Sequence, residues 1–466
     1  MFPTEIRRLL PRFKVSGRAG RAARIGVVSL GLGLSTAMAA ELTITPAPEP
    51  TLTGAVGDAE FPSGSWTYFD PGFLVDHLPF KLTIGQSISY SDNVANLPNN
   101  ATTLIGTNGV TRLPSRGDFY SDTTLGIASR FHLGAQTFFF NGTYAPRRYF
   151  TDTAINADNY SINGGVDFNV ADRCTGRLIG GVDQSQQPLE QVAGFGLQDV
   201  FSVSFNETSR CKLMANVASL FNSGVSRVEN SGAEVGGISA LDLAQNNYNQ
   251  YYVGGGLEYA LTSLDTLRGL VTYTHRDFTD RGPLVLTGLA DATDQEDFQF
   301  FYSRIFSTKL DGIASGGVSV FSFPGISGTT TEPIYSFTGN YRPTPKIVVS
   351  GVVSRSAGAP QSAISNIQIS DTQSLSLSYI YSPKLNLTGI VSHTTSQNPG
   401  AVSNIGNAPI LFNNTSTDNA SLVLNYKATP LLTATAAYSY VDRSDTSRSG
   451  TDAISNVFRV GLVYTR

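Results

Sequence analysis

The stretch Ser374-Leu-Ser-Leu-Ser-Tyr-Ile-Tyr-Ser-Pro383 alternates small polar residues with large apolar ones and then stops at a proline. Side chains of a β-strand point to opposite faces in turn, so the alternation predicts a strand with one polar and one apolar face. A second alternating segment begins directly after Pro383. The stretch therefore predicts a β-hairpin closed by a very short turn.

The same unit returns along the chain. In segments 341–345, 379–383 and 426–430 a tyrosine stands four residues before a proline, and an alternating strand follows each proline. Long polar segments separate one hairpin from the next. Strand, short turn, strand and long loop is the order typical of a transmembrane β-barrel. A soluble β-sandwich or β-helix with one buried face is the alternative architecture.

We expect an all-β, antiparallel up-and-down barrel of 16 to 18 strands, with 18 as the count that the pattern gives. Links after even-numbered strands are short and are expected to face the periplasm, whereas several links after odd-numbered strands are long and are expected to face outward. The predicted strands are 80–91, 119–131, 135–149, 159–170, 175–186, 197–208, 211–222, 248–260, 266–278, 295–307, 309–322, 332–342, 345–356, 371–382, 384–395, 417–428, 431–443 and 453–465. The long predicted loops include 92–118, 223–247, 279–294 and 396–416.

The alternation also assigns the two faces of the predicted strands. The apolar set is expected to face lipid and the Ser, Thr and Asn set to line an aqueous lumen. The candidate lumen-lining residues are Thr137, Asn141, Thr143, Arg147, Arg268, Thr272, Arg276, Ser374, Ser376 and Arg459. Tyrosines near the short turns fit an aromatic girdle at the membrane interface, and they are Tyr259, Tyr341, Tyr381, Tyr426 and Tyr464.

This predicted lumen wall is neutral and hydrogen-bonding, with a few scattered cations. Strong ion selection normally shows as rings of like charge, so such a wall suits sugars and other polar solutes better. Every barrel interior must be polar, however, so the pattern alone does not separate sugars from other polar solutes.

The N-terminus predicts a secretory signal peptide over residues 1–40. Seven basic residues precede position 25, an apolar run follows over 25–34, and Ala37-Met-Ala39 provides a small-residue cleavage site. Residues 41–79 form a segment rich in proline and acid, which we expect to stay in the periplasm as an irregular leader or to enter the lumen as a plug. Residues 80–466 are the predicted outer-membrane barrel.

The charge balance bears on the class of partner. Removing the signal peptide takes seven basic residues and one acidic residue from totals of 32 and 36, which leaves 25 and 35 and a formal charge of −10. An acidic chain is a poor match for nucleic acid, so we expect no nucleic-acid partner.

The two cysteines, Cys174 and Cys211, each fall in or beside a predicted short turn on the same rim. An oxidising compartment favours a disulfide between the two neighbouring hairpins. Two unpaired thiols remain the alternative, because bridging needs α-carbons within about 7 Å of each other. Two cysteines without nearby histidines cannot supply the four ligands of a structural metal site, so we expect no metal.

The four histidines, His77, His132, His275 and His393, form no recognisable hydrolase constellation. A histidine beside a loop acid, as in His275-Arg-Asp277, is more often a solvated surface residue than a catalytic base. We therefore expect neither enzymatic activity nor a cofactor.

Three segments carry a resemblance to a known family. Tyr90-Ser-Asp-Asn93, where the first strand runs into a long loop, and the hairpin formed by 252–259 and 270–278 resemble the β-barrel porin 2 family of Gram-negative outer-membrane proteins. The resemblance spans roughly residues 80–466. One departure is the chain end, where Tyr464 is followed by Thr465 and Arg466 instead of closing the chain with an aromatic residue.

That resemblance implies a conduit of the Gram-negative outer membrane involved in exopolysaccharide export. It also implies contact with outer-membrane lipid and lipopolysaccharide, with the barrel-assembly machinery and with periplasmic polysaccharide-export proteins. A general diffusion porin, and a plugged structural or adhesion barrel that acts through its outer loops, are the alternative functions.

Overall fold

The computed structural model describes residues 80–94, 104–106, 109–111, 116–171, 173–188, 197–232, 247–281, 290–324, 328–358, 366–399, 414–445 and 452–466. The predicted signal peptide (1–40) and the predicted leader (41–79) lie outside these residues. In the described part of the chain, no helix is long and apolar enough to cross a membrane.

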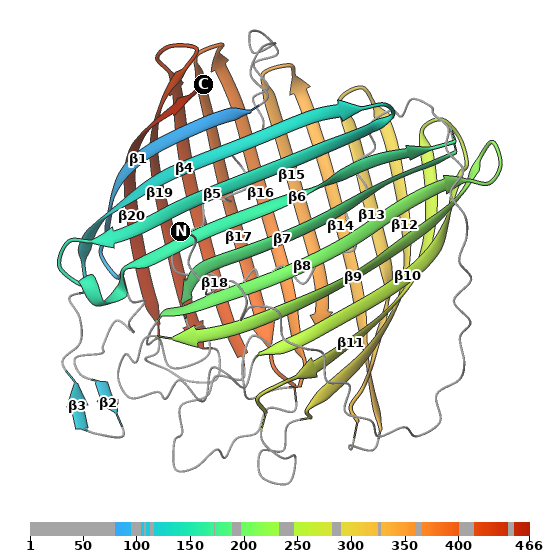
Figure 1. Cartoon of the computed structure of the whole chain (residues 1–466), viewed down its shortest axis with the longest axis horizontal. Helices are drawn as coiled ribbons and strands as arrows, with labels where there is room; N and C mark the ends of the chain where they lie inside the picture. The colour runs from blue at the N-terminus through green and yellow to red at the C-terminus, as the bar shows by residue number, and fades with distance from the viewer. Residues whose placement is uncertain are drawn as a thin grey trace, which may run out of the picture. The chain divides into compact units, whose positions relative to one another are not determined.

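Eighteen antiparallel strands form one closed sheet (Figure 1). Each strand pairs with the next along the chain, and β1 closes the ring by pairing with both β4 and β20. The eighteen-stranded antiparallel barrel predicted from the sequence is therefore confirmed. Its strands are β1 (Lys81–Ser91), β4 (Asp118–Leu133), β5 (Gln136–Tyr149), β6 (Ala157–Val170), β7 (Cys174–Pro188), β8 (Leu197–Lys212), β9 (Val217–Gly232), β10 (Tyr248–Ala260), β11 (Asp265–Phe278), β12 (Ala292–Ser307), β13 (Leu310–Ser322), β14 (Thr329–Thr344), β15 (Ile347–Gly358), β16 (Gln368–Ser382), β17 (Leu385–Gln397), β18 (Asn414–Lys427), β19 (Leu432–Asp445) and β20 (Ala453–Thr465).

Two small elements lie outside the barrel wall. The strands β2 (Leu104–Gly106) and β3 (Gly109–Thr111) form a separate two-stranded sheet in the link between β1 and β4. The 3-10 turn η2 (Thr153–Ile155) lies between β5 and β6.

Two predicted turns are displaced. The turn predicted at 343–344 lies at 345–346, because β14 runs to Thr344. The sequence pattern placed a turn at Ser209-Arg210, but β8 continues to Lys212 and the link is residues 213–216. The following strand, β9, extends to Gly232, so the first ten residues of the predicted loop 223–247 belong to the wall. The predicted turn failed because a polar run such as Asn206-Glu-Thr-Ser209 suits both a turn and a wet barrel face.

Hydroxyl side chains close several of the short turns. Ser307 Oγ accepts hydrogen bonds from the backbone N–H groups of Lys309 and Leu310, at 3.1 Å each. Ser382 and Thr429 make the same pair of bonds in their own turns. A Ser or Thr that satisfies two turn donors stabilises the tight link. We call the rim formed by these links the turn rim, and the opposite one the loop rim.

The two faces of the wall differ as the alternation predicts. Large apolar side chains share the outward face, and in β1 they are Leu82, Ile84 and Ile88, each more than 40% exposed. Contacts that reach over an intervening strand occur on the other face, as between Arg210 on β8 and Glu258 on β10. Side chains converge in that way only on the concave side of a sheet, so this face lines the lumen.

Candidate solute pathway in the barrel lumen

The strand register places all ten predicted lumen-lining residues on the concave face. On β5, Thr137, Asn141, Thr143 and Arg147 share that face, and Asn141 Nδ2 donates to Asn163 Oδ1 of β6 at 3.1 Å. The remaining six are Arg268, Thr272, Arg276, Ser374, Ser376 and Arg459. The wall is thus built from hydroxyl and amide groups with guanidinium groups between them.

The arginines of the lumen are clustered with acids. Toward the loop rim, Asp122 of β4 accepts from Arg147 Nε at 2.9 Å and from Arg459 Nη2 at 3.0 Å. The Arg147 guanidinium also lies 4.7 Å from the centre of the Tyr120 ring, which is fully buried. This cluster joins β5, β4 and β20 across the point where the chain closes the barrel on β1.

Two further clusters stand at the turn rim, and each holds two arginines on one acid. Glu258 of β10 accepts from Arg210 Nη2 at 2.6 Å and from Arg268 Nε at 2.7 Å, with only 5% of its side chain exposed. Asp167 of β6 accepts from Arg130 at 3.1 Å and from Arg177 in the same manner. We call these two groups the turn-rim triads.

A fourth group lies near the loop rim on the strands β10, β11 and β12. Arg276 of β11 is buried and donates to Gln250 Oε1 at 2.6 Å and to Gln295 Oε1 at 2.9 Å. Gln295 Nε2 donates in turn to Asp297 at 2.9 Å and to the carbonyl oxygen of Ala357 on β15 at 3.2 Å. The network therefore ties β12 to a strand three positions away.

Arg281, just beyond β11, links two segments of the loop rim. Its Nη1 donates to the carbonyl oxygen of Ala290 at 2.8 Å and to Asn366 Oδ1 at 3.3 Å, and its guanidinium lies 3.5 Å from the centre of the Phe278 ring. Burial lowers the pKa of Arg281 to about 10, so the group stays charged at neutral pH.

The histidines considered as catalytic candidates do not meet in the lumen. His275 lies on the outward face of β11, where its Nδ1 is 2.6 Å from Asp294 Oδ1 and its ring stacks on Tyr251. His393 lies on the outward face of β17, 2.8 Å from Asp418. Among the described residues, no group of three His, Cys, Asp or Glu side chains could hold a metal ion.

The five predicted girdle tyrosines all lie on the outward face near the turn rim. Their exposed fractions run from 39% for Tyr464 to 62% for Tyr381. A phenol ring on the outer wall near the turn rim suits a membrane–water interface, where the ring is buried and its hydroxyl is solvated.

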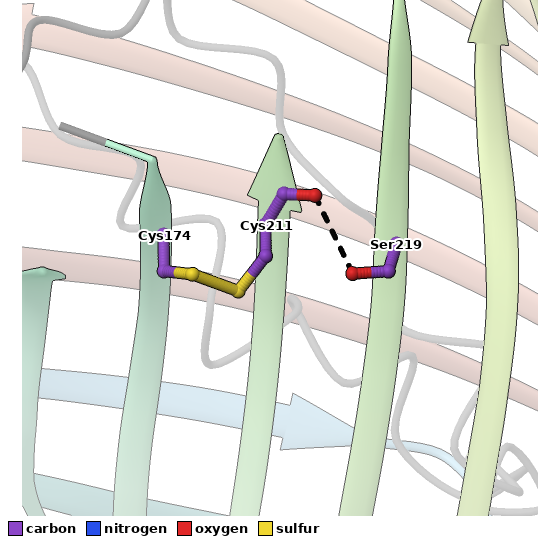
Figure 2. Close-up of a disulfide and its surroundings, with 3 residues drawn as sticks. All are labelled: Cys174, Cys211 and Ser219. Carbon is purple, nitrogen blue, oxygen red and sulfur yellow. Dashed lines mark hydrogen bonds between the residues drawn. A yellow bond between two sulfur atoms is a disulfide. The ribbon is translucent and has the colours of Figure 1, made fainter. Parts of the chain in front are cut away.

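Cys174 and Cys211 form a disulfide on the outward face next to the turn rim (Figure 2). They face each other directly across β7 and β8, with their α-carbons 4.0 Å apart. Cys174, predicted as the last residue of a turn, is the first residue of β7, and Cys211, predicted to begin a strand, lies near the end of the preceding strand β8. Ser219 of the next strand, β9, donates to the Cys211 carbonyl oxygen at 3.4 Å.

We expect this disulfide to form in an oxidising compartment and to stabilise the β7–β8 hairpin. Replacing both cysteines by alanine is expected to lower the free energy of unfolding by about 2–4 kcal/mol, because the crosslink restricts the unfolded chain. Electrophoresis of the unfolded protein with and without reductant tests the pairing. Identical migration together with two alkylatable thiols would exclude it.

Comparison with known proteins returned structures only. No family model and no curated protein matches the chain. The chain is similar to the FrpB iron transporter from Neisseria meningitidis (F3-3 variant), with 8% identity, a TM-score of 0.43 and coverage of 84% of this chain and 82% of that one. It is also similar to OccK2 (OpdF) from Pseudomonas aeruginosa in complex with glucuronate (11%, 0.42, 83% and 97%) and to the outer membrane protein opdK from the same organism (11%, 0.41, 83% and 98%). With no family model matched, membership of the β-barrel porin 2 family stays a hypothesis.

Sequence reasoning missed the acids of the lumen and five of its arginines. Asp122, Asp167 and Glu258 each stand at a polar-face position of an alternating strand, so the face was predictable. Their arginine partners come from strands up to 337 residues away, and pairing at that distance depends on register, which the pattern of one strand does not determine.

Proposed function

We propose that this protein is an outer-membrane conduit for polar solutes and that it serves exopolysaccharide export. The observation that carries the proposal is the two-faced wall. Eighteen strands present an apolar outer face and a concave face of hydroxyl, amide and guanidinium groups. A barrel of this strand number encloses enough space for water and solutes unless something fills it.

The outer face supports a location in a bilayer. Exposed apolar side chains occur around the ring, including Phe300 at 74% and Val460 at 62%. Such a surface would aggregate in water, whereas a closed sheet satisfies every backbone group and can lie in lipid. Outer-membrane lipid, lipopolysaccharide and the barrel-assembly machinery are the partners that this location implies.

The lumen wall supports a sugar-like cargo. Thr372 and Thr394 hydroxyls face each other at 3.3 Å, and Ser350 donates to Asn340 at 2.7 Å, so the concave face offers both donors and acceptors at short spacing. Hydroxyl and amide groups exchange hydrogen bonds with a sugar as readily as with one another. Periplasmic polysaccharide-export proteins would deliver the chain to the turn rim.

Single-channel current tests the proposed conduit. The mature chain, purified in detergent and inserted in a planar bilayer, is expected to give steady conductance that a neutral oligosaccharide interrupts. Heat-unfolded protein from the same preparation is the control. A folded, heat-modifiable barrel that gives no conductance would contradict the proposal and favour a plugged structural or adhesion barrel.

A further inference from the structure

The lumen face at the turn rim carries an excess of positive charge. Within the four strand residues nearest the turn rim, the inward-facing charged groups are the two turn-rim triads, the pair Arg342 and Asp311, and the lysines Lys81, Lys212 and Lys427. Eight of these groups are basic and three are acidic, a formal excess of five positive charges. We call this set the basic ring.

The rest of the lumen wall carries no such excess. Beyond those four residues, among the side chains that the structure describes, the inward-facing strand positions hold five carboxylates and four arginines, with Asp122 and Asp297 among the acids. The mature chain as a whole is acidic, with a formal charge of −10. The basic ring is therefore a local feature of one mouth and does not reflect the composition of the chain.

Several guanidinium groups of the basic ring are accessible. Arg130 and Arg177 are each 54% exposed on their side chains, although both contact Asp167. Arg342 is 46% exposed beside Asp311. Each triad sets two cations against one anion, so one carboxylate cannot neutralise its two partners. A planar guanidinium presents paired N–H donors that match a carboxylate, sulfate or phosphate group.

We infer that the basic ring is an entry site for an anionic polysaccharide, one that carries carboxylate groups along its chain. This inference rests on the proposed function and names its class of cargo. The ring concentrates the polyanion at the turn rim and gives repeated, exchangeable contacts around the mouth. The less positive wall beyond it holds the polymer less tightly, so the polymer passes on instead of remaining bound.

The test compares a double variant in the basic ring with a single-substitution control at the same rim. Arg130→Gln with Arg210→Gln removes one cation from each turn-rim triad and leaves Asp167 and Glu258 each with one arginine, so no buried carboxylate loses its last partner. Arg304→Gln is the control, because Arg304 lies at the same rim on the outward face, beside Asp265 at 3.4 Å. Heat-modifiable migration on gels shows that each variant is folded.

Oligogalacturonate and a neutral dextran oligomer of equal length are the probes. Equilibrium binding to the detergent-solubilised protein is expected to favour oligogalacturonate, to weaken with rising salt, and to fall about tenfold in the double variant while Arg304→Gln stays within about twofold. In bilayers with oriented protein, oligogalacturonate is expected to interrupt current more often from the turn-rim side than from the loop-rim side.

The outcomes separate the two proposals. Equal binding of both oligomers, salt-independent binding, or an equal loss in the Arg304→Gln control would each overturn the basic ring as an anion site. Selective binding of oligogalacturonate by a barrel that never conducts would support the ring and contradict the conduit. If the double variant fails to fold, two measurements on the native protein still test the basic ring as an anion site. They are the salt dependence of oligogalacturonate binding and the difference in current interruption between the two sides of the bilayer.

Discussion

Leu375→Arg is expected to destabilise the barrel folded in a bilayer by about 2–4 kcal/mol. Leu375 lies midway along β16 with 51% of its side chain exposed, and its outward neighbours Val391 and Leu422 are exposed to a similar degree. A cation at that height has neither water nor an acid within reach. Urea titration of the barrel in phospholipid vesicles measures the loss.

Ser374→Arg is the matched control, because Ser374 precedes Leu375 in the same strand and faces the lumen. The new cation there stays in water, so we expect a change in stability within about 0.5 kcal/mol and a change in conductance instead. A similar loss in both variants would contradict the assignment of the two faces. A larger loss for Ser374→Arg would invert it.

The wall of this protein was predictable from the sequence because one physical requirement acts on every strand. A wall with one apolar and one polar face must alternate the two kinds of side chain, which is the period of two that residues 374–382 show. Predicted strands 248–260 and 453–465 match β10 and β20 residue for residue. Where the period weakens, as around Asn206-Glu-Thr-Ser209, the predicted turn moved by four residues.

The site was predictable only in part. Arg147, Arg268 and Arg459 were placed on the lumen face by their strand position, but as scattered cations in a neutral wall. The structure brings each of them onto a carboxylate from another strand, two of them onto the same Asp122. The net charge at each mouth of the barrel is the sum over all strand ends that meet at that rim. Which ends meet there depends on how the whole sheet closes.

Three inward glycines sit where a neighbouring strand comes unusually close. A Cβ atom at Gly317 of β13 would lie 2.0 Å from the carbonyl oxygen of Phe298 on β12, and Gly165 and Gly256 meet neighbouring carbonyl oxygens at 2.0 and 2.1 Å. All three stand on the concave face, where a closed sheet must bend. The absence of a side chain there allows the close approach.

Gly317→Val is therefore expected to destabilise the barrel by about 3 kcal/mol or more, because the obstacle is backbone that cannot swing away and must shift as a strand. Gly316→Val is the control, since Gly316 faces outward with nothing within 4 Å of its added Cβ and valine suits a lipid-facing strand. The yield of heat-modifiable barrel after refolding into vesicles, followed by urea titration, measures both. If Gly317→Val folds as well as Gly316→Val, the close approach of β12 and β13 does not depend on a glycine at position 317. Other residues must then determine the bend of the wall.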